Sequence, residues 1–196
     1  MGKGNKLGFI LSATLMCVAM LASTAAAQNT NSGTSMQTGN KMATLSSSDR
    51  KFAMTAAMGG MAEVETARLA LTKASSDAVK QYAQKMIDDH TAANAELMQI
   101  ASTKGITLPT APDAKHRAMM AKMERLSGAA FDREYIMMAG HKDHQKMEKL
   151  FRDESMKGRD ADLKAFAAKT LPVVQQHLQM ARDLHDKMMP GMKHGM

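Results

Sequence analysis

Four long segments of this chain are built mostly from residues that favour the α-helix. Ala, Met, Lys, Leu and Glu dominate them, while most glycines and prolines gather at their boundaries. Within each segment, apolar residues recur at spacings of three, four and seven, which places them on one helix face. The sequence therefore predicts an all-α fold, with helices over residues of about 48–74, 77–104, 129–156 and 160–188.

The connections between these segments predict how the helices pair. Short turns near residue 75 and near Gly158 join the first helix to the second and the third to the fourth, so each pair forms an antiparallel hairpin. A longer connection contains Pro109 and Pro112, and residues 113–125 within it predict a short extra helix. Two hairpins with one longer crossover are typical of a ferritin-like four-helix bundle, and a plain up-down bundle is the alternative.

The N-terminal residues are typical of a secretory signal peptide. Lys3 and Lys6 precede an apolar run from Leu7 to Leu21, and the small residues Ala25–Ala27 follow. Cleavage at this point would also remove Cys17, the single cysteine, so disulfide and thiol chemistry are excluded from the mature protein. An uncleaved anchor is the alternative, but the run is short and weakly apolar for a membrane-spanning helix.

The predicted organisation has four parts. They are a signal peptide (1–27), a flexible polar linker rich in Asn, Ser, Thr and Gly (28–45), a helical bundle (46–188) and a Met- and His-rich tail (189–196). We expect an exported, periplasmic protein with no membrane-spanning segment after cleavage. It is soluble or peripherally associated with the envelope, because no alternating strands of an outer-membrane barrel occur.

The charged residues argue against a nucleic-acid partner. The chain carries 26 Lys and Arg against 19 Asp and Glu, but the signs are interspersed, as they are on solvated helix faces. A basic stripe is absent, and with no Trp, two Tyr and five Phe there are few aromatic side chains to stack on bases. Phosphate-binding loops and nucleophile motifs are also absent, so no enzyme activity is predicted and a redox enzyme is the least supported function.

One residue near the middle of each long segment is of a type that binds transition metals: Glu63, His90, His144 and His177. Counted from the two short turns, Glu63 and His90 differ in height along the bundle by about 5 Å, and His144 and His177 differ by about 7 Å. One carboxylate and three imidazoles that meet inside a bundle would suit Zn²⁺, Fe²⁺, Mn²⁺ or Cu²⁺. His141, one turn before His144, is a weaker candidate.

The residues that precede the candidate histidines argue against one class of metal site. A carboxylate-bridged di-iron site needs glutamate three residues before two of the histidines, where this chain has Ile87 and Val174. A mononuclear, histidine-rich site fits better. Asp89 directly precedes His90, and its side chain points about 100° away from that of the histidine. It is therefore predicted to be a surface residue or a residue that contacts a metal ligand without binding the metal itself. The alternative is a metal-free hydrogen-bond network that fixes the register of a structural module of the envelope.

Methionine is the second unusual feature, with 22 residues in the chain. Inside helices, methionine fills gaps in a core that has no Trp. In the C-terminal tail there is no core to fill, and thioethers combined with imidazoles suit Cu(I). Copper buffering by the tail is therefore a separate hypothesis, with the candidate ligands His185, Met188, Met189, Met192, His194 and Met196.

Several short motifs, taken together, resemble an exported bacterial family known as domain of unknown function family 4142. They are Asp88-Asp89-His90-Thr91, Leu126-Ser127-Gly128 leading to Phe131-Asp132-Arg133-Glu134-Tyr135, Lys142-Asp143-His144, and Leu171-Pro172 ahead of His177-Leu178. The resemblance covers residues of about 46–187 and implies a ferritin-like four-helix fold, but no established activity.

The four central candidates match recurring polar positions of that family, whereas His141 and the tail look like additions of this protein. The leading hypothesis is a periplasmic ferritin-like bundle that binds a metal ion through Glu63, His90, His144 and His177, in envelope metal handling or stress protection.

Overall fold

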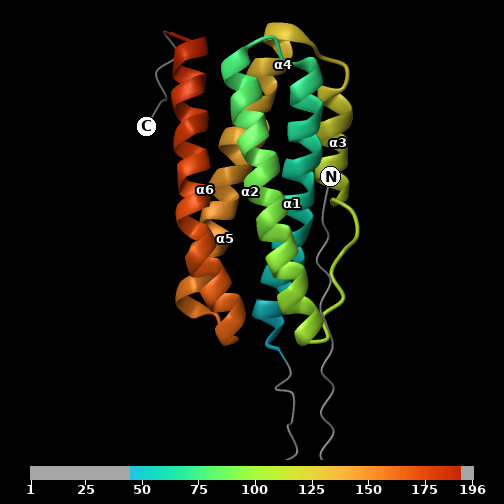
Figure 1. Cartoon of the computed structure of the whole chain (residues 1–196), viewed down its shortest axis with the longest axis vertical. Coiled ribbons are helices and arrows are strands. Elements are labelled where there is room, and N and C mark those ends of the chain that lie inside the picture. Colours follow the sequence, from blue (N-terminus) through green and yellow to red (C-terminus); the bar gives the residue numbers. More distant parts are fainter. Residues whose placement is uncertain (1–44, 191–196) are drawn as a thin grey trace, which may run out of the picture. The chain divides into compact units, whose positions relative to one another are not determined.

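The structure is a computed structural model that describes residues 45–190. Every regular element in this range is helical, which confirms the all-α prediction. The predicted signal peptide, nearly all of the linker and residues 191–196 of the tail lie outside the described residues. The elements are α1 (Ser47–Lys73), α2 (Asp77–Thr103), α3 (Ala114–Met123), α4 (Gly128–Tyr135), the π-helix η1 (Ile136–Asp143), α5 (His144–Lys157) and α6 (Ala161–Met188) (Figure 1).

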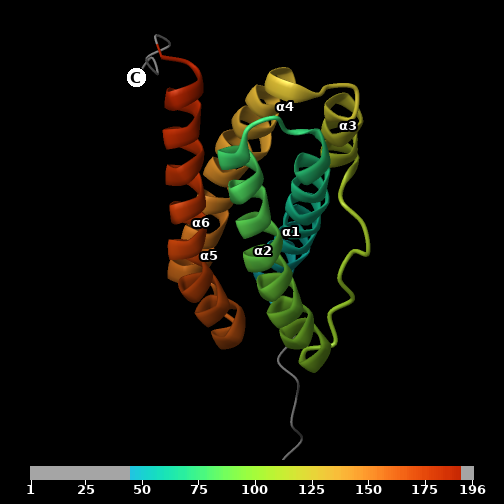
Figure 2. The same ribbon diagram turned by 45° about the horizontal axis from the view of Figure 1, so that its top comes forward.

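Four long helical segments lie side by side: α1, α2, the continuous segment α4–η1–α5, and α6 (Figures 1 and 2). The most extensive packing is that of α1 on α2 and of α5 on α6, which gives the two predicted hairpins. Their turns lie at opposite ends of the helices, and the connection after α2 returns along the helices through α3. As a result α2 and α4–η1–α5 run in the same direction. Among residues 45–190, no helix combines the length and the apolar character needed to cross a membrane.

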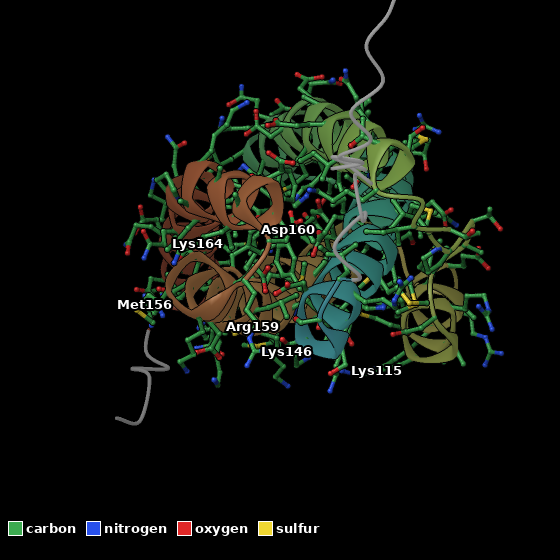
Figure 3. The ribbon with its side chains drawn as sticks, turned by 90° about the horizontal axis from the view of Figure 1, so that it is seen from below. Lys115, Lys146, Met156, Arg159, Asp160 and Lys164 are labelled. Carbon is green, nitrogen blue, oxygen red and sulfur yellow. The ribbon has the colours of Figure 1, made fainter. Side chains whose placement is uncertain are left out.

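Two buried aspartates fasten each hairpin to the turn of the other. Asp132 in α4 accepts hydrogen bonds from the backbone N–H and the hydroxyl of Ser75, at 3.1 and 2.7 Å, and from the N–H of Ser76 at 3.0 Å. Asp49 in α1 accepts from the N–H groups of Arg159 and Asp160, both at 3.1 Å, at the end viewed in Figure 3. Charge-assisted bonds of this kind are strong, so these two contacts set the relative height of the hairpins.

The buried apolar side chains form two clusters with a polar layer between them. Tyr82 and Tyr135 belong to the cluster near the α1–α2 turn, and Phe52 and Phe151 to the cluster near the α5–α6 turn. Along each of the four helical segments, the candidate residue is buried and stands in sequence between members of the two clusters: Glu63, His90, His144 and His177. The predicted candidates therefore occupy the middle of their helices.

The third long segment departs from the sequence prediction of an uninterrupted α-helix. Its middle is the π-helix η1, in which hydrogen bonds span five residues and each turn is wider. Gly140 lies in this stretch, where a Cβ atom would come within 2.9 Å of the Cβ of Ala181 and 3.3 Å of the hydroxyl of Tyr82. Glycine thus permits η1 to approach α6 closely. His144 is the first residue after η1.

Loss of the Asp132 contact is expected to destabilise the fold. Asp132→Ala removes an acceptor shared by three donors, and we expect the free energy of unfolding to fall by about 2–3 kcal/mol, because a hydrogen bond to a charged group contributes about 1.5–3 kcal/mol. Urea denaturation at pH 7 measures the change. The control is Asp153→Ala, whose carboxylate is paired with Lys149 and Lys157 on the surface and should contribute little. Equal stability of the two variants would contradict the role given to Asp132.

A buried carboxyl group near the α5–α6 turn makes stability depend on pH. Burial, followed by the nearby charge of Asp49, raises the pKa of Glu154 from 4.5 to about 7. The folded protein then binds this proton more tightly than the unfolded chain does, so stability falls as the pH rises from about 4.5 to about 7. We expect Glu154→Gln to have a higher melting temperature than the wild type at pH 8, with little difference at pH 4.5. A wild-type advantage at pH 8 would show that the ionised carboxylate is stabilising.

Candidate metal centre

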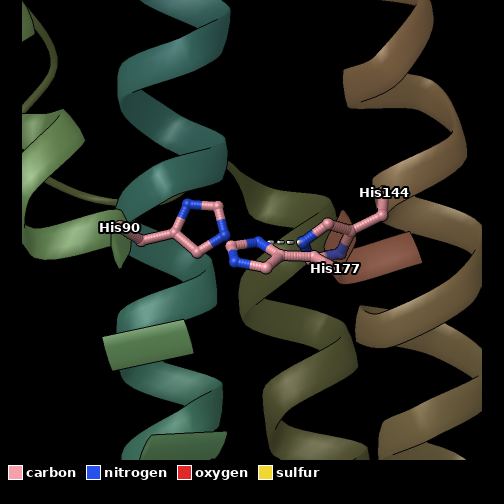
Figure 4. A group of neighbouring side chains, drawn as sticks. All are labelled: His90, His144 and His177. Carbon is pink, nitrogen blue, oxygen red and sulfur yellow. Dashed lines mark hydrogen bonds between the residues drawn. The ribbon is translucent and has the colours of Figure 1, made fainter. Parts of the chain in front are cut away.

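Three histidines from three different helical segments meet inside the protein (Figure 4). His90 comes from α2, His144 from the start of α5 and His177 from α6, with side chains exposed by only 8%, 1% and 1%. The ring centroids lie 5.3 to 5.5 Å apart, and one nitrogen of each ring lies within 4.8 Å of the other two. A single ion at the centre of this group could therefore contact all three.

The proton of His144 is fixed by the backbone of η1. Its Nδ1 lies 2.9 Å from the carbonyl oxygen of Ala139, five residues earlier. A carbonyl oxygen can only accept, so Nδ1 carries the hydrogen in this contact. Because burial is the main influence, and the charge of His177 adds to it, the pKa of His144 falls to about 4. At neutral pH the ring is uncharged, and Nε2 presents a lone pair to the centre of the group.

The proton of His177 is fixed by an aspartate on α2. Its Nε2 lies 2.7 Å from Oδ2 of Asp89, which also accepts a hydrogen bond from Lys85 at 2.8 Å. Partial burial raises the pKa of Asp89, but the hydrogen bonds from Lys85 and His177 outweigh it and the pKa is lowered overall. The carboxylate is therefore ionised and accepts, so Nε2 of His177 carries the hydrogen. Burial lowers the pKa of His177 despite the aspartate, which leaves Nδ1 with a free lone pair.

These two assignments bring two lone pairs face to face. Nε2 of His144 and Nδ1 of His177 are only 3.3 Å apart, the contact drawn as a dashed line in Figure 4. A hydrogen bond there would need an additional proton and hence a buried imidazolium, which the lowered pKa values of both rings oppose. Two nitrogens of a tetrahedral zinc site are separated by about 3.3–3.4 Å, since each Zn–N bond is about 2.0–2.1 Å. The spacing matches a pair of metal ligands.

His90 supplies the third nitrogen. Burial, followed by the charges of His144 and His177, lowers its pKa well below the ordinary value, so this ring is neutral as well. Its Nε2 is buried and has no hydrogen-bond partner among residues 45–190. An unpartnered buried nitrogen is energetically costly in a protein interior. Coordination of a cation would remove that cost.

Glu63 lies beside this group but not within it. Its Oε1 is 3.6 Å from Nδ1 of His144, on the opposite edge of the ring from the nitrogen that faces His177. Burial, and secondarily the charge of Asp143, raises the pKa of Glu63 well above its ordinary value, which favours the neutral acid. The predicted role of Glu63 as a fourth ligand therefore has no support from its position. The carboxyl group instead adjoins the outer edge of one histidine.

The other predicted candidates lie elsewhere. His141 is half-buried in η1 and does not join the histidine group. His185 belongs to the last turn of α6 and is buried there, and the half-buried Met188 packs against the core cluster near the α1–α2 turn. These two residues are parts of a packed helix, which agrees with the predicted bundle of residues 46–188 but not with their prediction as copper ligands of the tail. Met189 directly follows the helix, while Met192, His194 and Met196 lie outside the described residues.

Two contacts that orient the histidines were not predicted from sequence. The contact between Asp89 and His177 connects α2 to α6, and a period of 3.6 residues within one helix cannot reveal a bond to another helix. The carbonyl of Ala139 meets His144 beside the π-helix, which no residue pattern in the segment indicates. Gly140 and His141 lie in this segment, but both are compatible with an ordinary α-helix and so do not indicate the π-helix.

Comparisons with known proteins place the chain in a family. A family model described as domain of unknown function (DUF4142) matches residues 34–184, a range that contains all four central candidates. Neither the curated proteins nor the solved structures include a match to the chain. The family match agrees with the resemblance found in the sequence motifs and covers most of the chain. This protein therefore belongs to the family described as domain of unknown function (DUF4142).

Proposed function

We propose that this protein binds one transition-metal ion through the neutral imidazoles of His90, His144 and His177. The observation that carries the proposal is the 3.3 Å separation of two nitrogens whose hydrogens are already used on the outer edges of their rings. A cation between them turns a repulsive contact into two favourable bonds. His90 then adds a third ligand that has no other hydrogen-bond partner in the described range.

The ligand types favour particular metals. Three neutral imidazoles suit Zn²⁺, Cu²⁺ and Fe²⁺, and they are poor ligands for Ca²⁺ or Mg²⁺, which prefer oxygen. Metal-binding histidines usually donate their other N–H to a carboxylate or a backbone carbonyl, which fixes the ring orientation. His177 does this with Asp89, and His144 with Ala139. Both the three histidines and the groups that hydrogen-bond to them therefore support a metal site.

We extend the proposal to a ferritin-like fold and a periplasmic location. A ferritin-like bundle is supported by the two hairpins and by the returning connection, which makes α2 and α4–η1–α5 run in the same direction. A role in metal handling or stress protection in the periplasm is supported by the N-terminal signal pattern and by the buried histidines.

A structural role for the polar layer is the competing proposal. It is favoured by the position of the layer between two apolar clusters, where a hydrogen-bonded set would fix the register of the helices. The opposed nitrogens of His144 and His177 argue against it, because a network selected only for register would place a donor opposite an acceptor.

Metal stoichiometry separates the two proposals. The full chain, titrated with Zn²⁺ or Co²⁺ at pH 7, should bind one equivalent in the histidine group. His90→Ala should weaken this binding by roughly 100-fold or more, exceeding the 10–100-fold typical of a lost outer partner. The control is His116→Ala, which removes a histidine that contacts Asp113 and Asp143 outside the group.

A chain that ends at Pro190 should retain this equivalent, because the three proposed ligands all lie within residues 45–190. If His90→Ala binds the metal as tightly as the wild type does, the proposed site is wrong. If removal of residues 191–196 alone abolishes binding, the tail holds the metal.

The outer partner of His177 can be tested by an adjacent pair of variants. Asp89→Asn keeps the shape of the side chain but weakens the acceptor for Nε2 of His177, so we expect about 10–100-fold lower metal affinity by isothermal titration. Asp88→Asn is the matched control, because Asp88 is exposed and its carboxylate accepts a hydrogen bond from Gln84 within its own helix. An unchanged affinity in Asp89→Asn would mean that the aspartate does not orient His177.

A further inference from the structure

A cleft between α2 and α6 leads to the candidate metal centre. It has a volume of about 210 Å³, and its lining includes His90 and His177, two of the three proposed ligands. Asp89, Glu96 and Lys169 lie on its walls together with apolar side chains such as Val173. His144 is not part of the lining. An ion held by the three histidines would therefore have one side turned toward this cleft.

A small inner chamber adjoins the cleft. The two spaces share four lining residues, His90, Ala93, Thr170 and Val174, and the chamber is closed by core side chains that include Phe151. Its volume is about 20 Å³, which is room for about one water molecule. The space next to His90 therefore suits a ligand of only a few atoms.

The protein supplies only three ligands from the described residues. Glu63 faces the opposite edge of His144, and no carboxylate in the described range joins the histidine group. Metal sites with three histidines commonly keep a fourth position for water or another external ligand. Because two of the three imidazoles lie on the wall of the cleft, an external ligand could reach the ion from this side.

The charge of such a centre determines which ligands it attracts. Three neutral imidazoles leave the double positive charge of a divalent ion intact, and Asp89 offsets it only through His177. Lys169, which is paired with Glu96 at 2.8 Å, lies near the opening and is 70% exposed, so this ion pair is at the surface and can separate. A small anion could thus pass from solvent to the ion.

We propose that the metal bound by His90, His144 and His177 keeps an open fourth position facing the α2–α6 cleft, and that it takes up a small inorganic anion or hydroxide there. This inference rests on the proposed metal site. It describes an accessible centre that exchanges ligands with solvent, in contrast to a closed structural ion.

The test uses the full chain loaded with Co²⁺, with azide as the probe anion. Cobalt bound at the site should give a visible absorption spectrum that is lost in His90→Ala. Titration with azide should change this spectrum in a saturable way, with one azide per cobalt. A chain that holds one Co²⁺ and shows no change up to tens of millimolar azide would overturn the open position while leaving the metal site intact. Absence of bound Co²⁺ would overturn both proposals.

A pair of variants tests the location of the opening. Ala93→Phe fills the wall shared by the cleft and the chamber, and should weaken azide binding at least tenfold with the cobalt content unchanged. Ala95→Phe makes the same change at an exposed position of α2 outside both spaces and should bind azide like the wild type. If Ala93→Phe does not fold, Val173→Trp narrows the cleft from α6 instead. Equal azide affinity in the blocked and control variants would show that the anion does not use this cleft.

Discussion

The inward-facing nitrogens of His144 and His177 depend on hydrogen bonds made at the opposite edges of their rings. Ala139 accepts the hydrogen of one ring and Asp89 that of the other, so each ring is held with a lone pair toward the centre. Burial keeps both rings neutral, because a charged imidazole would lose its hydration. A proton between the rings is therefore disfavoured. Since a proton is disfavoured, a metal ion is the cation that best satisfies the facing nitrogens.

The rest of the fold keeps these groups at one level. Asp49 and Asp132 each fasten the turn of one hairpin to a helix of the other, at opposite ends of the structure. The two contacts have corresponding positions in the two hairpins, which agrees with a structure built from two similar halves. Apolar clusters cover the polar layer from above and below, and the α2–α6 cleft reaches it from the side. The π-helix η1 then brings a backbone carbonyl to His144 on the side away from the other histidines.

Helical periodicity explains why part of this site was predictable. His90, His144 and His177 stand on apolar faces at corresponding distances from the turns, so their meeting follows from helix rise alone. The helices and hairpins followed from the same pattern. The position of the Glu63 carboxyl group did not follow from this pattern. A residue on the correct helix face can still approach the wrong edge of a histidine ring. The bond from Asp89 depends on how α2 and α6 are rotated against each other, and η1 has no signature in composition. His185 was named as a copper ligand of the tail, although the same helical pattern extended the last helix to residue 188, and in the structure it is buried in α6.

X-ray absorption spectroscopy of the zinc-loaded full chain is the sharpest test of the three-histidine site, because it identifies the atoms bound to the metal. We expect three imidazole ligands with Zn–N distances of about 2.0–2.1 Å, one further light atom in the fourth position and no sulfur. Sulfur ligands, or at most one imidazole, would contradict it. Such a result would place the ion in the methionine-rich tail or on the surface, and would leave the three histidines as a structural layer of the bundle.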